Sequence, residues 1–151
     1  MIADTQAREK LVAAWKRVRI SLEMVRTNHA MAHFRGAPLT PDYTALAHNL
    51  VLVYAFAVFE GALEKLEEEG TLPPTKGGLK RLMAASQKFL PWQDFGAVDA
   101  GRDERNLVAH EGAALPPERC VHHIDAIERE LVAWKVLPGP IKATYTISVG
   151  G

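Results

Sequence analysis

Residues 50–59 read Leu-Val-Leu-Val-Tyr-Ala-Phe-Ala-Val-Phe, a run that is apolar on every side of a helix. The run lies inside a longer segment that we predict to be one helix, with Asp42 as its N-cap and Gly70 as its stop. A helix that is apolar all round is buried by several neighbours. Because crossing a bilayer takes about 20 apolar residues, we interpret this run as the centre of a bundle. Other helices cover it, either alone or together with a second copy of the chain.

Four further helices are predicted around this centre, with proline and glycine breakers between them. They span about residues 4–34, 79–90, 93–111 and 116–137. In the short helix predicted over about residues 79–90, the side chains expected to point inward are Leu79, Leu82, Met83 and Phe89. The sequence therefore predicts an all-α fold, an antiparallel bundle of about five helices over residues 1–137.

The tail, residues 138–151, has a different pattern. From Ile141 to Val149 apolar and polar residues alternate, which is typical of a strand. A lone strand cannot satisfy its own backbone groups, so it is either paired, for example with a second copy, or mobile at the terminus. We expect a short extended tail after the bundle, and its pairing stays open.

Composition restricts the classes of function. A chain of 151 residues with 48% hydrophobic residues is enough for one domain with its own core. Its 18 basic and 18 acidic residues cancel, so any contact with nucleic acid has to be local, and we expect no membrane partner. The single cysteine, Cys120, fits a reducing compartment and is best interpreted as a small buried residue. Since residues 1–10 lack the layout of a signal peptide, we predict a cytoplasmic protein.

Two clusters outside the central helix are candidate ligand sites. His29 and His33 have the i, i+4 spacing of a helical metal pair, but no further histidine, glutamate or cysteine pattern accompanies them. We therefore predict no metal site and no cofactor. Between residues 75 and 90 the chain has four basic residues and no acid, namely Lys76, Lys80, Arg81 and Lys88. This segment is a candidate for contact with an RNA backbone, and a solvated face explains it equally well.

Residues 102–112, Arg-Asp-Glu-Arg-Asn-Leu-Val-Ala-His-Glu-Gly, gather charged and titratable groups near the end of a predicted helix. Arg105 supplies a permanent cation, and His110 supplies an imidazole, a group that can act as a general acid or base. A histidine can take the proton from a 2′-hydroxyl, a second acid can protonate the leaving 5′-oxygen, and an arginine can stabilise the phosphorane. These groups suffice to cleave RNA without a metal. Because one helix supplies one histidine, the scheme works best with two copies facing each other across a twofold axis.

The stretch Arg105-Asn106-Leu107-Val108-Ala109-His110 resembles the Arg-X4-6-His motif of HEPN domains. The long first helix, the apolar second helix and the position of the motif late in the bundle are also similar. The resemblance implies a metal-independent RNA endonuclease with a composite site at a homodimer interface, in a toxin–antitoxin or defence system. It implies Arg105 as the phosphate clamp, His110 as the general acid or base, and Asn106 as a support.

The resemblance also implies a role for Glu60, which corresponds to an acidic residue that some members place on the second helix opposite the motif. Independently, a glutamate that leaves a buried helix needs a cation, so we predict that Glu60 approaches Arg105 or Arg102. The expected partners are RNA, a second copy of the chain and a separate antitoxin or regulatory protein. Two alternatives remain: a non-catalytic adaptor module for a protein or RNA, and an Arg105 and His110 that only stabilise the last turn of their helix.

Overall fold

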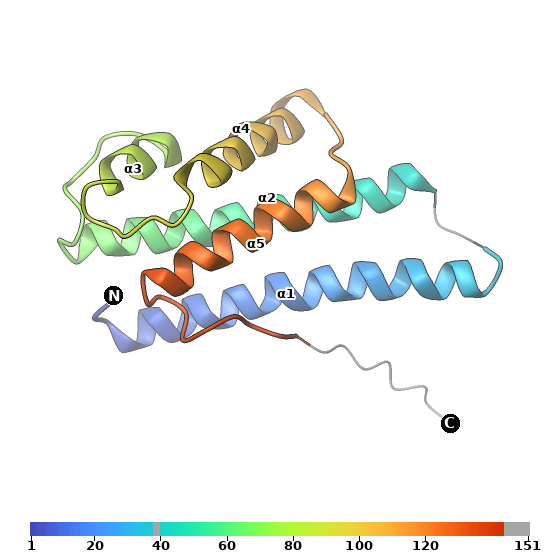
Figure 1. The fold of residues 1–151 in the computed structure, drawn as a ribbon, viewed down its shortest axis with the longest axis horizontal. Helices are drawn as coiled ribbons and strands as arrows, with labels where there is room; N and C mark the ends of the chain where they lie inside the picture. Colours follow the sequence, from blue (N-terminus) through green and yellow to red (C-terminus); the bar gives the residue numbers. More distant parts are fainter. Residues whose placement is uncertain (38–39, 144–151) are drawn as a thin grey trace.

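Five α-helices make up the fold in the computed structural model, which describes residues 1–37 and 40–143. They are α1 (Thr5–Phe34), α2 (Pro41–Glu68), α3 (Leu79–Ser86), α4 (Phe95–Glu111) and α5 (Pro117–Ala133), and the described ranges contain no strand. Figure 1 shows α1, α2 and α5 side by side, with α3 and α4 packed along the opposite edge of α2. The prediction of an all-α bundle of five helices is confirmed.

The second helix is the centre of this bundle, because α2 contacts each of the other four helices. Its side chains Leu52, Phe56, Phe59 and Leu63 are completely buried. By length and composition alone α2 is also long and apolar enough to cross a membrane, and just over half of its most apolar stretch is buried inside the protein. These buried side chains form the core with residues from every other helix, including Trp15, Met83, Val98, Ile124 and Ile127.

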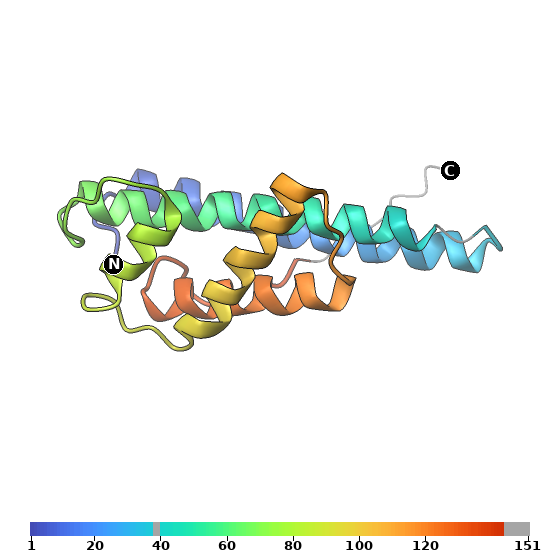
Figure 2. The ribbon, with the colours of Figure 1, turned by 90° about the horizontal axis from the view of Figure 1, so that it is seen from above.

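One side of α2 is open to solvent in the single chain. Tyr43, Leu46, Leu50 and Tyr54, spaced three or four residues apart, are 57%, 55%, 60% and 37% exposed. Neighbouring helices of the same chain therefore cover most of the run 50–59 but leave Leu50 and Tyr54 exposed, so cover by a second copy stays a prediction. Figure 2 gives the reason: α4 crosses α2 near its middle, so the first half of α2 lies beside α1 without a cover above it. We refer to these four side chains as the α2 stripe.

Helix ends differ from the predictions at three places. The N-cap of α2 is Thr40 and not Asp42, because the Thr40 side chain accepts a hydrogen bond from the backbone N–H of Tyr43 at 3.2 Å and Pro41 occupies the first turn. The helix α3 ends at Ser86, four residues earlier than predicted. The helix α5 ends at Ala133, because Lys135 adopts a left-handed conformation with φ of 58°.

The early end of α3 changes which side chain points inward. The backbone N–H groups of Phe89 and Leu90 both donate to the carbonyl of Ser86, which closes a turn before Pro91. This turn leaves Phe89 55% exposed, whereas Leu90 is buried. The prediction of an inward Phe89 is wrong, because it extended helical spacing through a turn. Leu79, Leu82 and Met83 are buried as predicted.

Two further predictions concern the tail and Cys120. Residues 138–143 form no strand, and Ile141 packs against the core. The rest of the predicted alternation, residues 144–149, lies outside the described residues. Cys120 is fully buried, as predicted, and burial raises the pKa of its thiol to about 11. The side chain therefore stays a neutral, small core residue at neutral pH.

Candidate functional site

A cavity of about 420 Å³ lies where α2, α3 and α4 meet. Glu60 lines it from α2 and residues 78–81 line it from the start of α3. From α4 it is lined by Arg102, Arg105 and Asn106. The fold thus brings three separate segments together, and most of the candidate residues of the sequence share one polar cavity.

Arg105 is held in this cavity by contacts on several sides. One of its terminal nitrogens is 3.9 Å from the Glu60 carboxylate, and the other donates a hydrogen bond to the Asn106 side-chain oxygen at 3.0 Å. The guanidinium carbon is 5.8 Å from the centre of the Phe56 ring, a favourable cation–π distance. The buried Nε of Arg105 has no hydrogen-bond acceptor among the described residues. The prediction that Glu60 approaches Arg105 or Arg102 is confirmed for Arg105.

Arg102 has a different environment, although it lines the same cavity. Its side chain is only 7% exposed, and its guanidinium contacts Asp99 at 2.9 Å and Asp103 at 2.8 Å. These two carboxylates, one turn before and one residue after, compensate its charge within α4. Arg102 is therefore a structural element of the helix, and Arg105 is the one that pairs with Glu60.

His110 lies apart from the cavity in the single chain. It is exposed in the last turn of α4, and it makes no hydrogen bond or ion pair with the residues that the structure describes. It comes five positions after Arg105, which corresponds to about 140° around an ideal helix. Arg105 therefore faces α2 while His110 faces solvent. One chain alone does not place the two side chains against the same phosphate.

Two buried anchors that the sequence did not reveal fix the ends of α4. Before the helix, the Glu130 carboxylate of α5 accepts hydrogen bonds from the backbone N–H groups of Gln93 and Asp94 at 2.8 and 2.7 Å. After the helix, the buried Asn49 side chain donates to the Leu115 carbonyl at 2.9 Å and accepts from the Leu115 N–H at 3.0 Å. Both anchors satisfy backbone groups of the loops that flank α4. They set the position of the Arg105 to His110 segment.

A third anchor joins the middle of α4 to α5. The buried His123 ring contacts the Glu104 carboxylate at 2.7 Å, and Arg119 reaches the other oxygen of Glu104. Burial lowers the pKa of His123, and the neighbouring His122 and Arg119 act in the same direction, so the neutral ring donates its Nε2–H to Glu104. Gly101 is the sequence signal for this contact, because a glycine inside a helix often marks close packing.

Replacing Gly101 with alanine is expected to destabilise the protein by about 1–3 kcal/mol, although alanine is the better helix former. A Cβ at this position would lie 2.9 Å from Cγ and Nδ1 of His123, whose ring is buried. Urea denaturation measures the change. The matched control is Gly96→Ala in the same helix, where the nearest atom, Asp94 Oδ1, is at an ordinary 3.6 Å. Equal stability of both variants would contradict the close packing of α4 on α5.

The other candidates of the sequence separate into two groups. Lys80 and Arg81 line the cavity, whereas Lys76 and Lys88 are exposed outside it. His29 contacts the Thr44 hydroxyl at 3.3 Å. Within residues 1–37 and 40–143 there is no group of three side chains that could hold a metal ion.

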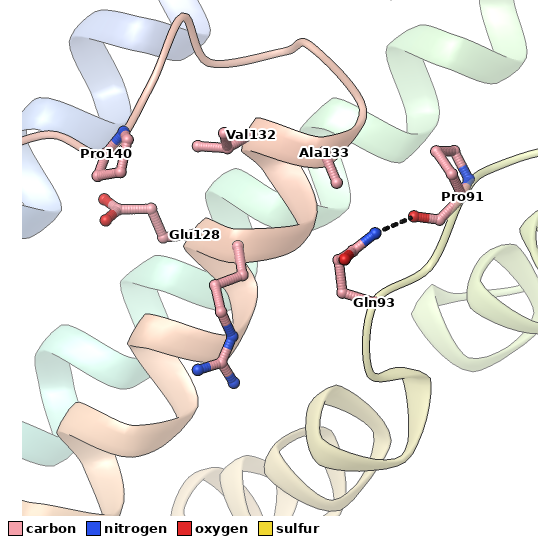
Figure 3. Close-up of a pocket in the computed structure, with 7 residues that line it drawn as sticks. Pro91, Gln93, Glu128, Val132, Ala133 and Pro140 are labelled. Carbon is pink, nitrogen blue, oxygen red and sulfur yellow. Dashed lines mark hydrogen bonds between the residues drawn. The ribbon is translucent and has the colours of Figure 1, made fainter.

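A larger cavity of about 500 Å³ lies elsewhere, between α5 and the segments on either side of it. Figure 3 shows Pro91, Gln93, Val132, Ala133 and Pro140 around it, with Gln93 donating to the Pro91 carbonyl. None of the candidate residues of the sequence lines it. Glu128, at its edge, is occupied by structural contacts with Trp15 at 2.6 Å and with Arg19 at 2.7 Å. We therefore place the candidate site in the smaller, more polar cavity.

Comparison with known proteins gives no relative to guide this choice. Neither a protein-family model, nor a curated protein, nor a solved structure matches the chain. The function has to be inferred from the chemistry of the residues that the fold brings together.

Proposed function

We propose that the protein is a metal-independent RNA endonuclease of the HEPN type that works as a homodimer. The observation that carries this proposal is the shared cavity, in which Arg105 and Asn106 of the Arg-X4-His stretch lie against Glu60. Glu60 and the Phe56 ring hold the guanidinium, and its buried Nε still lacks an acceptor among the described residues. A preoriented guanidinium that lines a polar cavity suits a phosphodiester oxygen.

In the proposed reaction, the imidazole of one His110 takes the proton from a 2′-hydroxyl. The resulting oxygen attacks the neighbouring phosphorus, and the imidazolium of the second His110 gives a proton to the leaving 5′-oxygen. Arg105 stabilises the charge that develops on the non-bridging oxygens, and Asn106 orients Arg105 through their hydrogen bond. The products are a 2′,3′-cyclic phosphate and a 5′-hydroxyl. No metal takes part in these steps.

The α2 stripe supports the second copy that this reaction needs. An exposed row of large apolar side chains along a helix is typical of a surface that another protein covers. Helical spacing continues the row from Tyr54 to Ala57 and Gly61, which lie three residues before and one residue after Glu60. Leu107 of α4, between Arg105 and His110 in sequence, is also 42% exposed. A twofold contact along this surface would bury the apolar side chains and bring the ends of two α4 helices toward one groove.

The test is incubation of single-stranded RNA with the wild-type protein in EDTA, followed by analysis of the product ends. Fragments that carry a 2′,3′-cyclic phosphate support the proposal. Failure to cleave a pool of diverse RNA sequences, by a protein that is folded and dimeric, contradicts it. In a toxin–antitoxin or defence system, a separate antitoxin chain would restrain this activity.

A non-catalytic adaptor module is the second candidate function. The observation that favours it is the exposed position of His110 outside the cavity of its own chain. In this alternative, the cavity holds a phosphate of RNA and the α2 stripe holds a partner protein, but no bond is cleaved. RNA binding without cleavage by the wild-type dimer distinguishes this module from the endonuclease.

A further inference from the structure

We propose that the first turn of α3 forms a second phosphate subsite, which binds the phosphodiester next to the one that is cleaved. This inference rests on the proposed function for its assignment of the cleaved phosphate to Arg105. The turn contributes Lys80 and Arg81, which line the same cavity as Arg105 and Asn106. The α3 segment is thus one wall of the site and not only a basic region beside it.

The charges in the cavity are unevenly compensated. Arg102 is paired with Asp99 and Asp103, and Arg105 lies near Glu60. For Lys80 and Arg81, the described part of the chain supplies no carboxylate within ion-pair distance. The α3 wall therefore carries two positive charges that are available to an anion. Phosphate groups of RNA are the anions that the neighbouring arginine is proposed to bind.

The Arg81 side chain is positioned by its own loop. Its guanidinium donates a hydrogen bond to the Lys76 carbonyl, and its stem lies against Gly77. Gly77 has a φ of +141°, and a Cβ there would lie 2.5 Å from Cδ of Arg81. A side chain at position 77 would displace the arginine, so the glycine permits this placement. Because the Arg81 side chain is already held in place, it loses less conformational entropy when an anion binds.

The backbone at the start of α3 also favours an anion. Gly78 is the N-cap and provides no side-chain acceptor, and the first turn contains no acid. The N–H groups of Leu79 and Lys80 meet no acceptor in the described ranges. Unsatisfied donors at the positive end of a helix dipole favour an anion at the same place as the two side chains.

The lining residues also indicate which part of the RNA binds. They are charged, polar or small apart from Leu79, and among residues 1–37 and 40–143 no aromatic side chain lines the cavity to stack on a base. The subsite therefore recognises backbone and not sequence. We expect the substrate to be single-stranded RNA with at least two consecutive phosphodiesters, and a dinucleotide with one phosphodiester to be cleaved poorly.

The test compares two double variants that remove the same charge from the same segment. Lys80→Ala with Arg81→Ala changes the cavity wall, and Lys76→Ala with Lys88→Ala changes exposed positions outside it. The probe is a decamer of 2′-O-methyl RNA, which keeps its phosphates but lacks the attacking hydroxyl. We expect the first variant to bind the decamer about tenfold more weakly. The slope of the logarithm of the binding constant against the logarithm of the salt concentration should become shallower by about 0.7, because one phosphate contact is lost. Equal losses in both variants would overturn the subsite.

A second readout separates this inference from the proposed function. Titration of the wild-type protein with inorganic phosphate, followed by NMR, should shift the amide signals of Leu79 and Lys80, and the cavity variant should lose these shifts. Phosphate binding at these amides without any RNA cleavage supports the subsite and contradicts the endonuclease. RNA cleavage by a cavity variant that is as fast as wild type, with no phosphate shifts in the wild type, contradicts the subsite alone.

Discussion

Alanine at Arg105 or at His110 is expected to lower the rate of RNA cleavage in EDTA by about 10²- to 10³-fold. General acid–base catalysis and stabilisation of a developing anion each contribute on this scale. Arg105 contacts Glu60 and Asn106 but carries no other long-range ion pair in the described chain, and His110 is exposed. We therefore expect both variants to keep their fold. The rate of cleavage of a fluorescent RNA measures the effect directly.

The matched control for these variants is Glu111→Ala. Glu111 is the last residue of α4, follows His110 directly and is exposed. It should keep at least half of the wild-type rate, because surface substitutions of this kind change stability by only about 0.5 kcal/mol. A His110→Ala variant that cleaves RNA as fast as wild type would exclude the proposed chemistry.

Aspartate at Leu50 is expected to convert the proposed dimer to a monomer and to reduce the proposed RNA cleavage by about 10²-fold at micromolar protein. Leu50 is the most exposed member of the α2 stripe, so the charge is harmless in a single chain but is buried without a partner when two stripes meet. Light scattering gives the molar mass, and the same samples give the cleavage rate.

The control for this variant is Phe89→Asp. Phe89 is a comparably exposed apolar side chain, 55% against 60% for Leu50, but it lies in the turn after α3. This variant should remain dimeric and active. A wild-type protein that is monomeric at concentrations at which it cleaves RNA would contradict the role assigned to the α2 stripe.

The centre of the fold and one contact of the candidate site could be predicted from the sequence. The apolar run at residues 50–59 predicted a helix surrounded by others, because nothing but a core hides so much apolar surface in water. Glu60 follows that run directly, and a partly buried carboxylate requires a cation. This reasoning predicted that Glu60 approaches Arg105 or Arg102, and in the structure its partner is Arg105.

The remaining features depend on contacts between distant segments, which periodicity does not encode. Asn49 and Glu130 both bind backbone groups of loops far away in the sequence, and neither position has a pattern that identifies its partner. Helical spacing shows that Leu50 is apolar but not which neighbour covers it. For the same reason, the sequence placed Lys80 and Lys88 in one basic segment, whereas the fold places only Lys80 at the cavity.

The most direct measurement of the two-copy site mixes wild-type protein with inactive His110→Ala protein after subunit exchange. RNA is kept in large excess, so that competition for substrate does not contribute. If each site needs a histidine from both copies, cleavage by a fixed amount of wild type should fall steadily as the variant is added, because wild-type chains become trapped in mixed dimers. Cleavage that stays constant, at a ratio where mixed dimers are shown to form, would mean that each chain acts alone.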